Sequence, residues 1–315
     1  MQNLKRPLSS PEHRLKKFII IDGPAILHRA WHALPKLTDP QGKTINALYG
    51  FAMLLLKLIR EFQPEYIVCA FDTHAPTFRH QLYKEYKATR TPQPQEFYEQ
   101  IPRTKKLLNT FNIKSKEKGG FEADDFIAQF KETAPKNILK IIVSGDSDVF
   151  QLIDQKTLVY FLKKGIGKTQ LYDEKAVKKR FDLSPKQLVD YKALKGDPSD
   201  NIPGIPGIGD KTAIQLLKKF ETLENIYQHL KMPKNSWQIK ASLGNLLLKH
   251  YPSVMLAKKL SILQKNPHLS VNFKECSFDK LNIQKIKKHF EKLGFKSLIP
   301  RLEELQSIRQ QNKLL

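Results

Sequence analysis

A crowded group of carboxylates stands at the start of a helix-like pattern. Glu122, Asp124 and Asp125 lie within four residues, directly after Gly119-Gly120-Phe121. Apolar residues at 123, 126, 127 and 130 have the spacing of one buried helix face, and the two aspartates lie off that face. Acids in a first helical turn are favoured by the helix dipole, but three so close together repel one another unless a cation lies among them. The stretch alone leaves helix capping and metal binding open.

Other aspartates follow runs that predict β-strands. Four short, continuous apolar runs are typical of strands buried on both faces: residues 18–21, 66–71, 138–143 and 157–162. Helical patterns separate these runs, the clearest at 46–62, which predicts βαβ units and a largely parallel sheet. Asp22, Asp72 and Asp146 each follow the end of a run. Because ligands bind beyond the carboxyl ends of parallel strands, we expect these three aspartates at one edge of the sheet.

The candidate metal ligands form a larger set once the remaining acids are added. Asp148 closes the sequence Ser-Gly-Asp-Ser-Asp, and two further aspartates precede a glycine-rich loop. The full set is Asp22, Asp72, Glu122, Asp124, Asp125, Asp146, Asp148, Asp197 and Asp200. So many carboxylates in one cleft require cations, and oxygen-only ligands favour Mg²⁺ or Mn²⁺ over zinc. Two such ions about 4 Å apart would activate a water and stabilise the leaving oxygen of a phosphodiester.

The bulk composition points to a polyanionic partner. The chain of 315 residues has 54 Lys and Arg against 31 Asp and Glu, a net charge of +23, which favours nucleic acid over a membrane. No apolar run reaches the length of a membrane span. Residues 1–17 are polar and basic, unlike a signal peptide, so we expect a mobile arm and a cytoplasmic protein. Cys69 and Cys276 alone form neither a disulfide framework nor a cysteine zinc site.

One segment interleaves basic and aromatic residues in a way that suits a nucleic-acid strand. Residues 76–103 contain few aliphatic residues that could fill a core. Charges would contact phosphates and rings would stack on bases, although a solvated pair of amphipathic helices is the alternative. The candidate contacts are Arg79, Tyr83, Lys84, Tyr86, Lys87 and Arg90.

A second candidate for DNA contact is the loop at 202–213, which precedes an amphipathic run at 214–220 in a region that reads as helical from Asp173 onward. Glycines before a helix start expose backbone N–H groups that can receive a phosphate. The spacing matches a helix-hairpin-helix and lacks the pattern of a P-loop. Its candidate contacts are Gly204, Gly207, Gly209, Lys211 and Thr212.

The ordered motifs resemble the 5′ nuclease family, which includes the N-terminal nuclease domain of bacterial DNA polymerase I and the flap endonucleases. They are FIIIDG, AFDTHAPTFRHQLYKEYKATR, GFEADD, SGDSD and GDPSDNIPGIPGIGDKTA, and the resemblance covers residues 18–305. No polymerase sequence follows, so the chain resembles the stand-alone bacterial 5′-3′ exonuclease. The resemblance implies a PIN-like α/β fold with a mostly parallel sheet at 18–180 and an arch at 76–103. A helical helix-hairpin-helix domain at 181–306 and a tail at 307–315 would follow.

The resemblance also implies roles for particular residues. Asp22, Asp72, Glu122, Asp124 and Asp125 would organise a first Mg²⁺. Helix geometry adds that the acids at 122, 124 and 125 do not share one helix face, so we expect Asp125 to act through water. Asp146 would lie between two ions, and Asp148, Asp197 and Asp200 would hold the second. Lys87 and Arg90 would stabilise the scissile phosphate, and Tyr83 and Tyr86 would stack on the displaced base. The glycine-rich loop would grip the downstream duplex, in this family often with a bound K⁺.

The implied reaction is two-metal hydrolysis of DNA near a 5′ end, at flaps, nicks or RNA-primed junctions. A monomer that acts with a separate DNA polymerase and ligase is expected. Two positions depart from the family pattern, Pro24 after Asp22-Gly23 and Ser147 between Asp146 and Asp148, and neither removes a ligand. The alternatives are a non-catalytic module that binds branched DNA and a PIN-type ribonuclease, which shares the carboxylate edge.

Overall fold

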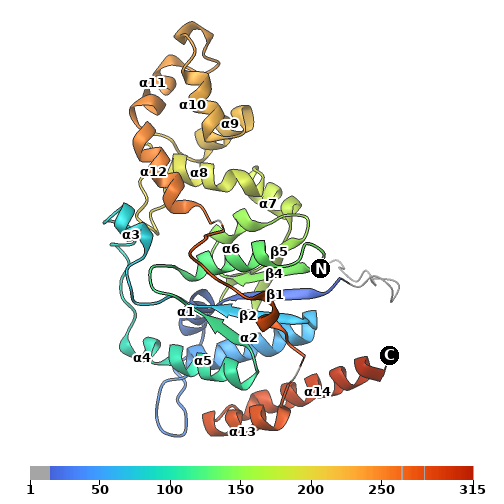
Figure 1. Ribbon diagram of the computed structural model, residues 1–315. Coiled ribbons are helices and arrows are strands. Elements are labelled where there is room, and N and C mark those ends of the chain that lie inside the picture. The colour runs from blue at the N-terminus through green and yellow to red at the C-terminus, as the bar shows by residue number, and fades with distance from the viewer. Residues whose placement is uncertain (1–14, 264, 280, 315) are drawn as a thin grey trace.

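The centre of the protein is a six-stranded sheet (Figure 1). The structure is a computed structural model that describes residues 15–263, 265–279 and 281–314. The strand order is β3-β2-β1-β4-β5-β6, and only β5 and β6 pair antiparallel. The strands are β1 Lys17–Asp22, β2 Tyr66–Ala70, β3 Lys114–Lys116, β4 Leu139–Ser144, β5 Thr157–Lys164 and β6 Lys168–Tyr172. The four predicted strands and the mostly parallel sheet are confirmed. The two strands that were not predicted, β3 and β6, are polar edge strands without a continuous apolar run.

The order of the strands brings the three strand-end aspartates together. Strand β1 lies between β2 and β4, with Ile19 in register with Ile67 on one side and Ile141 on the other. Asp22 is the last residue of β1, and the other two aspartates follow β2 and β4 by two residues. The prediction that they share one edge of the sheet is therefore confirmed.

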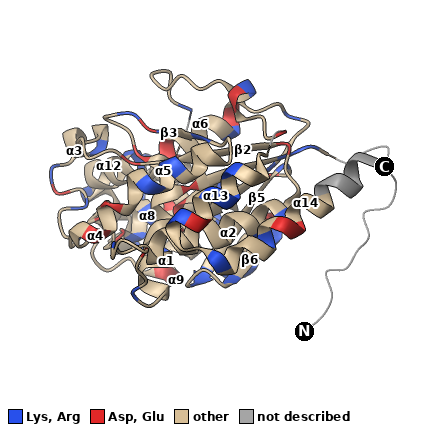
Figure 2. Cartoon of the chain, turned by 90° about the horizontal axis from the view of Figure 1, so that it is seen from below, with Lys and Arg blue, Asp and Glu red and all other residues tan. Residues whose placement is uncertain are grey.

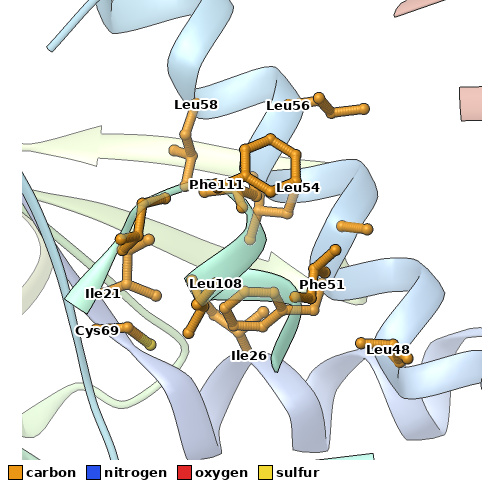
Figure 3. Packing of buried hydrophobic residues seen from close by; sticks show 14 of the residues in the cluster. Ile21, Ile26, Leu48, Phe51, Leu54, Leu56, Leu58, Cys69, Leu108 and Phe111 are labelled. Carbon is orange, nitrogen blue, oxygen red and sulfur yellow. The ribbon is translucent and has the colours of Figure 1, made fainter. Parts of the chain in front are cut away.

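Alternate residues of β1 face two different hydrophobic layers. Ile19 and Ile21 belong to the cluster formed with α1 (Gly23–Ala33), α2 (Asn46–Phe62) and α5 (Gln100–Thr110). Figure 3 shows side chains of this layer, among them Phe51 of α2 and Phe111 after α5. Residues 18 and 20 face the opposite layer, which contains α6 (Ala123–Thr133). Burial on both faces explains why the strands are continuous apolar runs.

A helical region extends from one end of the sheet (Figure 1). Its helices are α7 Glu174–Phe181, α8 Leu188–Lys195, α9 Asp210–Phe220, α10 Leu223–Leu230, α11 Ala241–Lys249 and α12 Tyr251–Ser261. From α8 onward these helices share their own core, separate from the two layers at the sheet, and α8 lies against α12. None of the described helices is long and apolar enough to cross a bilayer.

The C-terminal helices pack on the sheet domain, which differs from the predicted helical domain at 181–306. Helix α13 (Ile283–Leu293) contacts α5, and α14 (Ile299–Leu314) contacts α2, as the view from below in Figure 2 also shows. Their apolar residues complete the layer around α2, which needs a cover on its outer side. The predicted tail at 307–315 continues α14, with residue 315 outside the described residues. Of the predicted arm at 1–17, residues 1–14 also lie outside them.

Replacing Phe290 by Ala should destabilise the sheet domain. Its ring is fully buried, 6.0 Å from the ring of Phe111 and 5.8 Å from that of Phe295. We expect a loss of about 3–5 kcal/mol in the free energy of unfolding, measured by denaturant titration, because a cavity remains between α13 and α5. Leu248→Ala, at a side chain that is 41% exposed, is the control. A loss for Phe290→Ala as small as that of the control would contradict this placement.

Candidate metal centre and nucleic-acid interface

Asp22 is held in place by the start of α1. Its Oδ1 accepts a hydrogen bond from Ala25 N at 3.0 Å, and its Oδ2 accepts one from Ser144 Oγ at 2.5 Å. Pro24 lies in the first turn of α1, where a missing N–H costs nothing because that group has no partner within the helix. The departure at Pro24 is therefore compatible with the turn that orients Asp22.

Ser144 connects the acids that follow β4. This buried serine donates to Asp22 and accepts from Asp146 N at 2.9 Å. Asp146 Oδ1 in turn accepts from Asp148 N at 2.9 Å. Ser147, which lies between these two aspartates in the sequence, is exposed. A single series of hydrogen bonds thus positions Asp22, Asp146 and Asp148 beside one another.

A first group of acids lines a cavity of about 1580 Å³ at this edge of the sheet. Asp72 accepts from Ala123 N at 2.7 Å, which fixes its carboxylate at the start of α6. The cavity wall also includes basic side chains, among them Arg29, Lys164 and Lys168. The acidic members of the wall are Asp22, Asp72, Glu122, Asp124 and Asp146.

The first group is electrostatically strained without a cation. Burial raises the pKa of Asp22 to about 7. Hydrogen bonds from Ser144 and Ala25 oppose this upward shift, and the negative charges of Asp72 and Asp146 add to it. Burial also raises the pKa of Asp124 well above its usual range, and Asp22 and Asp146 contribute. Close carboxylates with raised pKa values on fixed backbone are a donor set that fits a hard divalent cation.

A second group consists of Asp148, Asp197 and Asp200. One carboxylate oxygen from each lies within 4.8 Å of the others. Lys192 of α8 lies among them, with its Nζ in ion-pair contact with Asp148, 2.6 Å from Asp197 Oδ2 and 4.0 Å from Asp200 Oδ2. Burial raises the pKa of Asp148 to about 6, although Lys192 opposes the shift. Burial lowers the pKa of Lys192, but the three carboxylates outweigh it and the net shift is upward.

Asp125 and Arg79 form a buried pair, which corrects two sequence predictions. Arg79 donates from both terminal nitrogens to Asp125, at 2.9 and 2.8 Å, and its Nε donates to Leu260 O in α12 at 2.9 Å. Arg79 is only 1% exposed, so its guanidinium has no free surface for a DNA contact. Both oxygens of Asp125 are bonded to Arg79, one also accepts from Glu122 N, and Asp125 is not part of the cavity wall that contains the other acids, so its carboxylate belongs to the buried pair and not to the first group.

The turn at 83–90 lies directly over the two acidic groups. Lys87 Nζ is 2.9 Å from Glu122 Oε1, and Arg90 Nη2 donates to Asp200 Oδ1 at 2.6 Å. The hydroxyl of Tyr86 is 3.1 Å from Glu122 Oε2 and 3.3 Å from Asp200 Oδ2. Because Tyr86 is 3% exposed and its ring packs in the helical core, the prediction that it stacks on a base does not fit this structure.

The expected helical arch is instead two short helices joined by turns. Helix α3 covers Phe78–Leu82 and α4 covers Gln95–Tyr98, and the chain between them runs along one edge of the molecule (Figure 1). The backbone of this segment is bonded to the loop before the hairpin, through Lys87 N to Asp200 O at 2.9 Å and Asn201 Nδ2 to Glu85 O at 2.6 Å. Lys84 is exposed and Tyr83 half-buried, so both remain available for contacts.

Helices α8 and α9 enclose the predicted glycine-rich loop. Gly207 has φ +86°, which favours glycine, and a Cβ at Gly204 would lie 2.1 Å from Lys195 O. Gly209 caps α9, so the next N–H groups lack partners within the helix. Lys211 is exposed and Thr212 half-buried at this helix start. Asp210 is paired there with Lys195 at 2.6 Å.

Lys192 is a site residue that was not predicted from the sequence. Its partner Asp148 is 44 positions away in the sequence, so no local pattern connects the two residues. In the sequence, Lys192 does not differ from the many other lysines of this chain. The only local signal is that its helix, α8, leads directly into Asp197.

Replacing Arg79 by Met should cost about 3–5 kcal/mol in the free energy of unfolding, because Asp125 would remain buried without its partner. Denaturant titration measures the change. Lys84→Met removes an exposed lysine from the same segment and is the matched control. Equal stabilities of the two variants would contradict a structural role for Arg79.

Mg²⁺ should stabilise the protein more at about pH 8 than at about pH 5.5. The folded protein without metal holds a proton on Asp22 up to about pH 7, above the pKa of 3.8 in the unfolded chain. Its stability therefore falls as the pH rises through this window, and a cation bound to the ionised carboxylate offsets that loss. Thermal melts with Mg²⁺ and with EDTA measure the difference, and NaCl at matched ionic strength is the control. An equal Mg²⁺ shift at both pH values would contradict this.

Two family models match the chain in succession. The N-terminal resolvase-like domain of 5′-3′ exonucleases matches residues 17–182, and the C-terminal SAM fold of 5′-3′ exonucleases matches residues 183–284. DNA polymerase I of Bacillus caldotenax is 36% identical over 289 residues, which are 91% of this chain and 32% of that protein. DNA polymerase I of Bacillus subtilis is 35% identical over 301 residues, 95% of this chain and 34% of that protein. The chain thus spans about a third of the length of these relatives.

Solved structures share the fold. The T5 D15 protein co-crystallised with metal ions has a TM-score of 0.67 at 18% identity, covering 93% of this chain and 99% of that one. The catalytic core of Rad2 in complex with DNA substrate has a TM-score of 0.57 at 19% identity, covering 91% of this chain and 92% of that one. With both family models matched in order over residues 17–284, the chain belongs to the 5′-3′ exonuclease family.

Proposed function

We propose that the protein is a divalent-metal-dependent, structure-specific 5′-3′ exonuclease and flap endonuclease that hydrolyses DNA phosphodiesters near 5′ ends. The observation that carries this proposal is the cavity at the sheet edge, whose wall contains the acids at the end of β1, after β2, at the start of α6 and after β4. Membership of the 5′-3′ exonuclease family supports the same reaction. The net charge of +23 supports a polyanionic substrate.

The two acidic groups would hold two ions. Asp22, Asp72, Asp124 and Asp146 offer carboxylates to the first site, with Glu122 at its margin. Asp148, Asp197 and Asp200 offer one oxygen each to the second site. Mg²⁺, with Mn²⁺ as a substitute, would lower the pKa of a bound water and stabilise charge on the leaving oxygen. Hydrogen bonds from the backbone N–H groups of Ala25, Ala123 and Asp148 would hold the carboxylate oxygens of Asp22, Asp72 and Asp146 in position for such ions.

The basic side chains over the acids would orient the substrate. Lys87 and Arg90 pair with Glu122 and Asp200, and both could exchange these carboxylates for the scissile phosphate. Tyr83 and Lys84 in the same segment would contact the displaced strand. The free N–H groups at the start of α9, together with Lys211 and Thr212, would bind the backbone of the downstream duplex, with K⁺ as a further ligand of this loop.

The proposed substrates are 5′ flaps, nicks and RNA-primed junctions, which arise in DNA replication and repair. Such a nuclease would act in the cytoplasm as a monomer, before a separate DNA polymerase and ligase complete the strand. The solved T5 D15 flap endonuclease with DNA and metal ions, and the Rad2 core with DNA substrate, support DNA as the substrate because they share this fold.

Asp146→Asn should abolish cleavage of a 5′-flap duplex in Mg²⁺ while the affinity for that duplex is retained. The amide keeps the hydrogen-bonding shape of the loop after β4 but removes the charge that both ions would need. Single-turnover cleavage and fluorescence anisotropy on the same labelled flap measure the two properties.

The unaltered protein and Asp154→Asn, at an acid paired with Lys131 outside the cavity, are the controls. Absence of cleavage by the unaltered protein in both Mg²⁺ and Mn²⁺ would overturn the proposed activity and leave a branched-DNA-binding module. Faster cleavage of single-stranded RNA than of flapped DNA would instead identify a ribonuclease.

A further inference from the structure

The second acidic group already surrounds a cation of the protein itself. The Oδ2 atoms of Asp148, Asp197 and Asp200 all face Lys192 Nζ, at distances up to 4.0 Å. The Lys192 side chain is 14% exposed, and those of the aspartates are 21, 15 and 9% exposed. A lysine is buried to this degree only when carboxylates compensate its charge. The ammonium is therefore a built-in part of this group.

The position of Lys192 is fixed by its helix. Its neighbours Ala193 and Leu194 are fully buried in the helical core, and α8 lies against α12. The next lysine of the helix, Lys195, points to a different partner, because its Nζ pairs with Asp210 at 2.6 Å. Lys192 thus reaches the three aspartates from a rigid element, while Lys195 on the same helix does not.

Two of the three remaining oxygens of the group are also occupied. Asp197 Oδ1 accepts from Ser199 N at 2.9 Å, and Asp200 Oδ1 accepts from Arg90. A divalent ion that binds Asp197 and Asp200 must therefore use their Oδ2 atoms, which are the oxygens that face Lys192. An ammonium and a divalent ion cannot both lie at contact distance from these shared oxygens, because the two cations would repel each other strongly in a partly buried site.

We propose that Lys192 is the resident counter-ion of the second site, and that a divalent ion binds Asp148, Asp197 and Asp200 only by displacing the Lys192 ammonium. Lys192 thereby makes the second site bind a divalent ion more weakly than the first. Among the described residues, the lysine that pairs with an acid of the first group is Lys87, which contacts Glu122. It is a positioning residue that sets the affinity for the second metal. This inference rests on the two-ion site of the proposed function.

Mn²⁺ binding to the full chain tests this without any cleavage assay. Free Mn²⁺ is measured by electron paramagnetic resonance during titration of the unaltered protein, Lys192→Met and Lys195→Met. We expect the second Mn²⁺ to bind Lys192→Met at least about tenfold more tightly than the unaltered protein, since both the competitor and its repulsion are removed. Lys195→Met loses the same charge from the same helix and should bind Mn²⁺ as the unaltered protein does.

Two further measurements keep the outcomes distinct. Lys192→Arg retains the charge and should keep the second site weak. Without metal, Lys192→Met should melt at a lower temperature than Lys195→Met and should gain more from Mn²⁺, because its three aspartates lack a counter-ion. Unchanged or weaker second-site affinity in Lys192→Met would overturn the inference, even if the unaltered protein cleaves flaps. Failure of every variant to bind Mn²⁺ would overturn the proposed metal sites as well.

Discussion

Mutual repulsion among carboxylates at one edge of the sheet is the constraint on which the rest of the site depends. The parallel order of β2, β1 and β4 brings Asp22, Asp72 and Asp146 to the same edge. Burial there makes ionisation costly, as the raised pKa of Asp22 indicates. Hydrogen bonds from Ser144 and from backbone N–H groups offset part of this cost. The remainder requires positive charge, which the protein supplies from elements outside the sheet.

Those positive charges connect distant parts of the chain. Arg79 joins α3 to α6 through Asp125 and to α12 through Leu260 O. Arg90 joins the turn at 83–90 to the loop before the hairpin, and Lys192 joins α8 to the loop after β4. Charge compensation therefore holds the helical region and the segment over the cleft against the acidic edge. The ion pairs that neutralise the acids thus also hold the proposed substrate-binding segments beside the cavity.

Local patterns were sufficient to predict the four buried strands and the acids that follow them. The buried runs at β1, β2 and β4 are continuous because both faces of each strand are covered, and that continuity is visible in the sequence. The pairing of Arg79 with Asp125 spans 46 positions, and no local period reports it. Arg79 and Tyr86 were predicted to contact DNA because basic and aromatic residues are the usual nucleic-acid contacts. Only the fold shows that both are buried.

The domain on which α13 packs could not be predicted from the sequence, for a related reason. An amphipathic helix has an apolar face, but the pattern does not say which core that face completes. Phe290 lies against Phe111 of the sheet domain, although the helices that precede it in the chain share a different core. The segment was expected to be helical, as it is, but it was assigned to the helical domain at 181–306 and packs on the sheet domain instead.

Basic residues in this protein fall into two physical classes, and a net charge of +23 does not separate them. Exposed lysines such as Lys84 and Lys211 would act on a polyanion through water, so salt screens their contribution. Arg79 and Lys192 are enclosed with their carboxylates, where screening by salt is weak. Added salt would therefore release a DNA backbone long before it disturbs the acidic edge. The acids can thus stay organised while substrates bind and leave, because the charges that hold them are not the charges that hold the DNA.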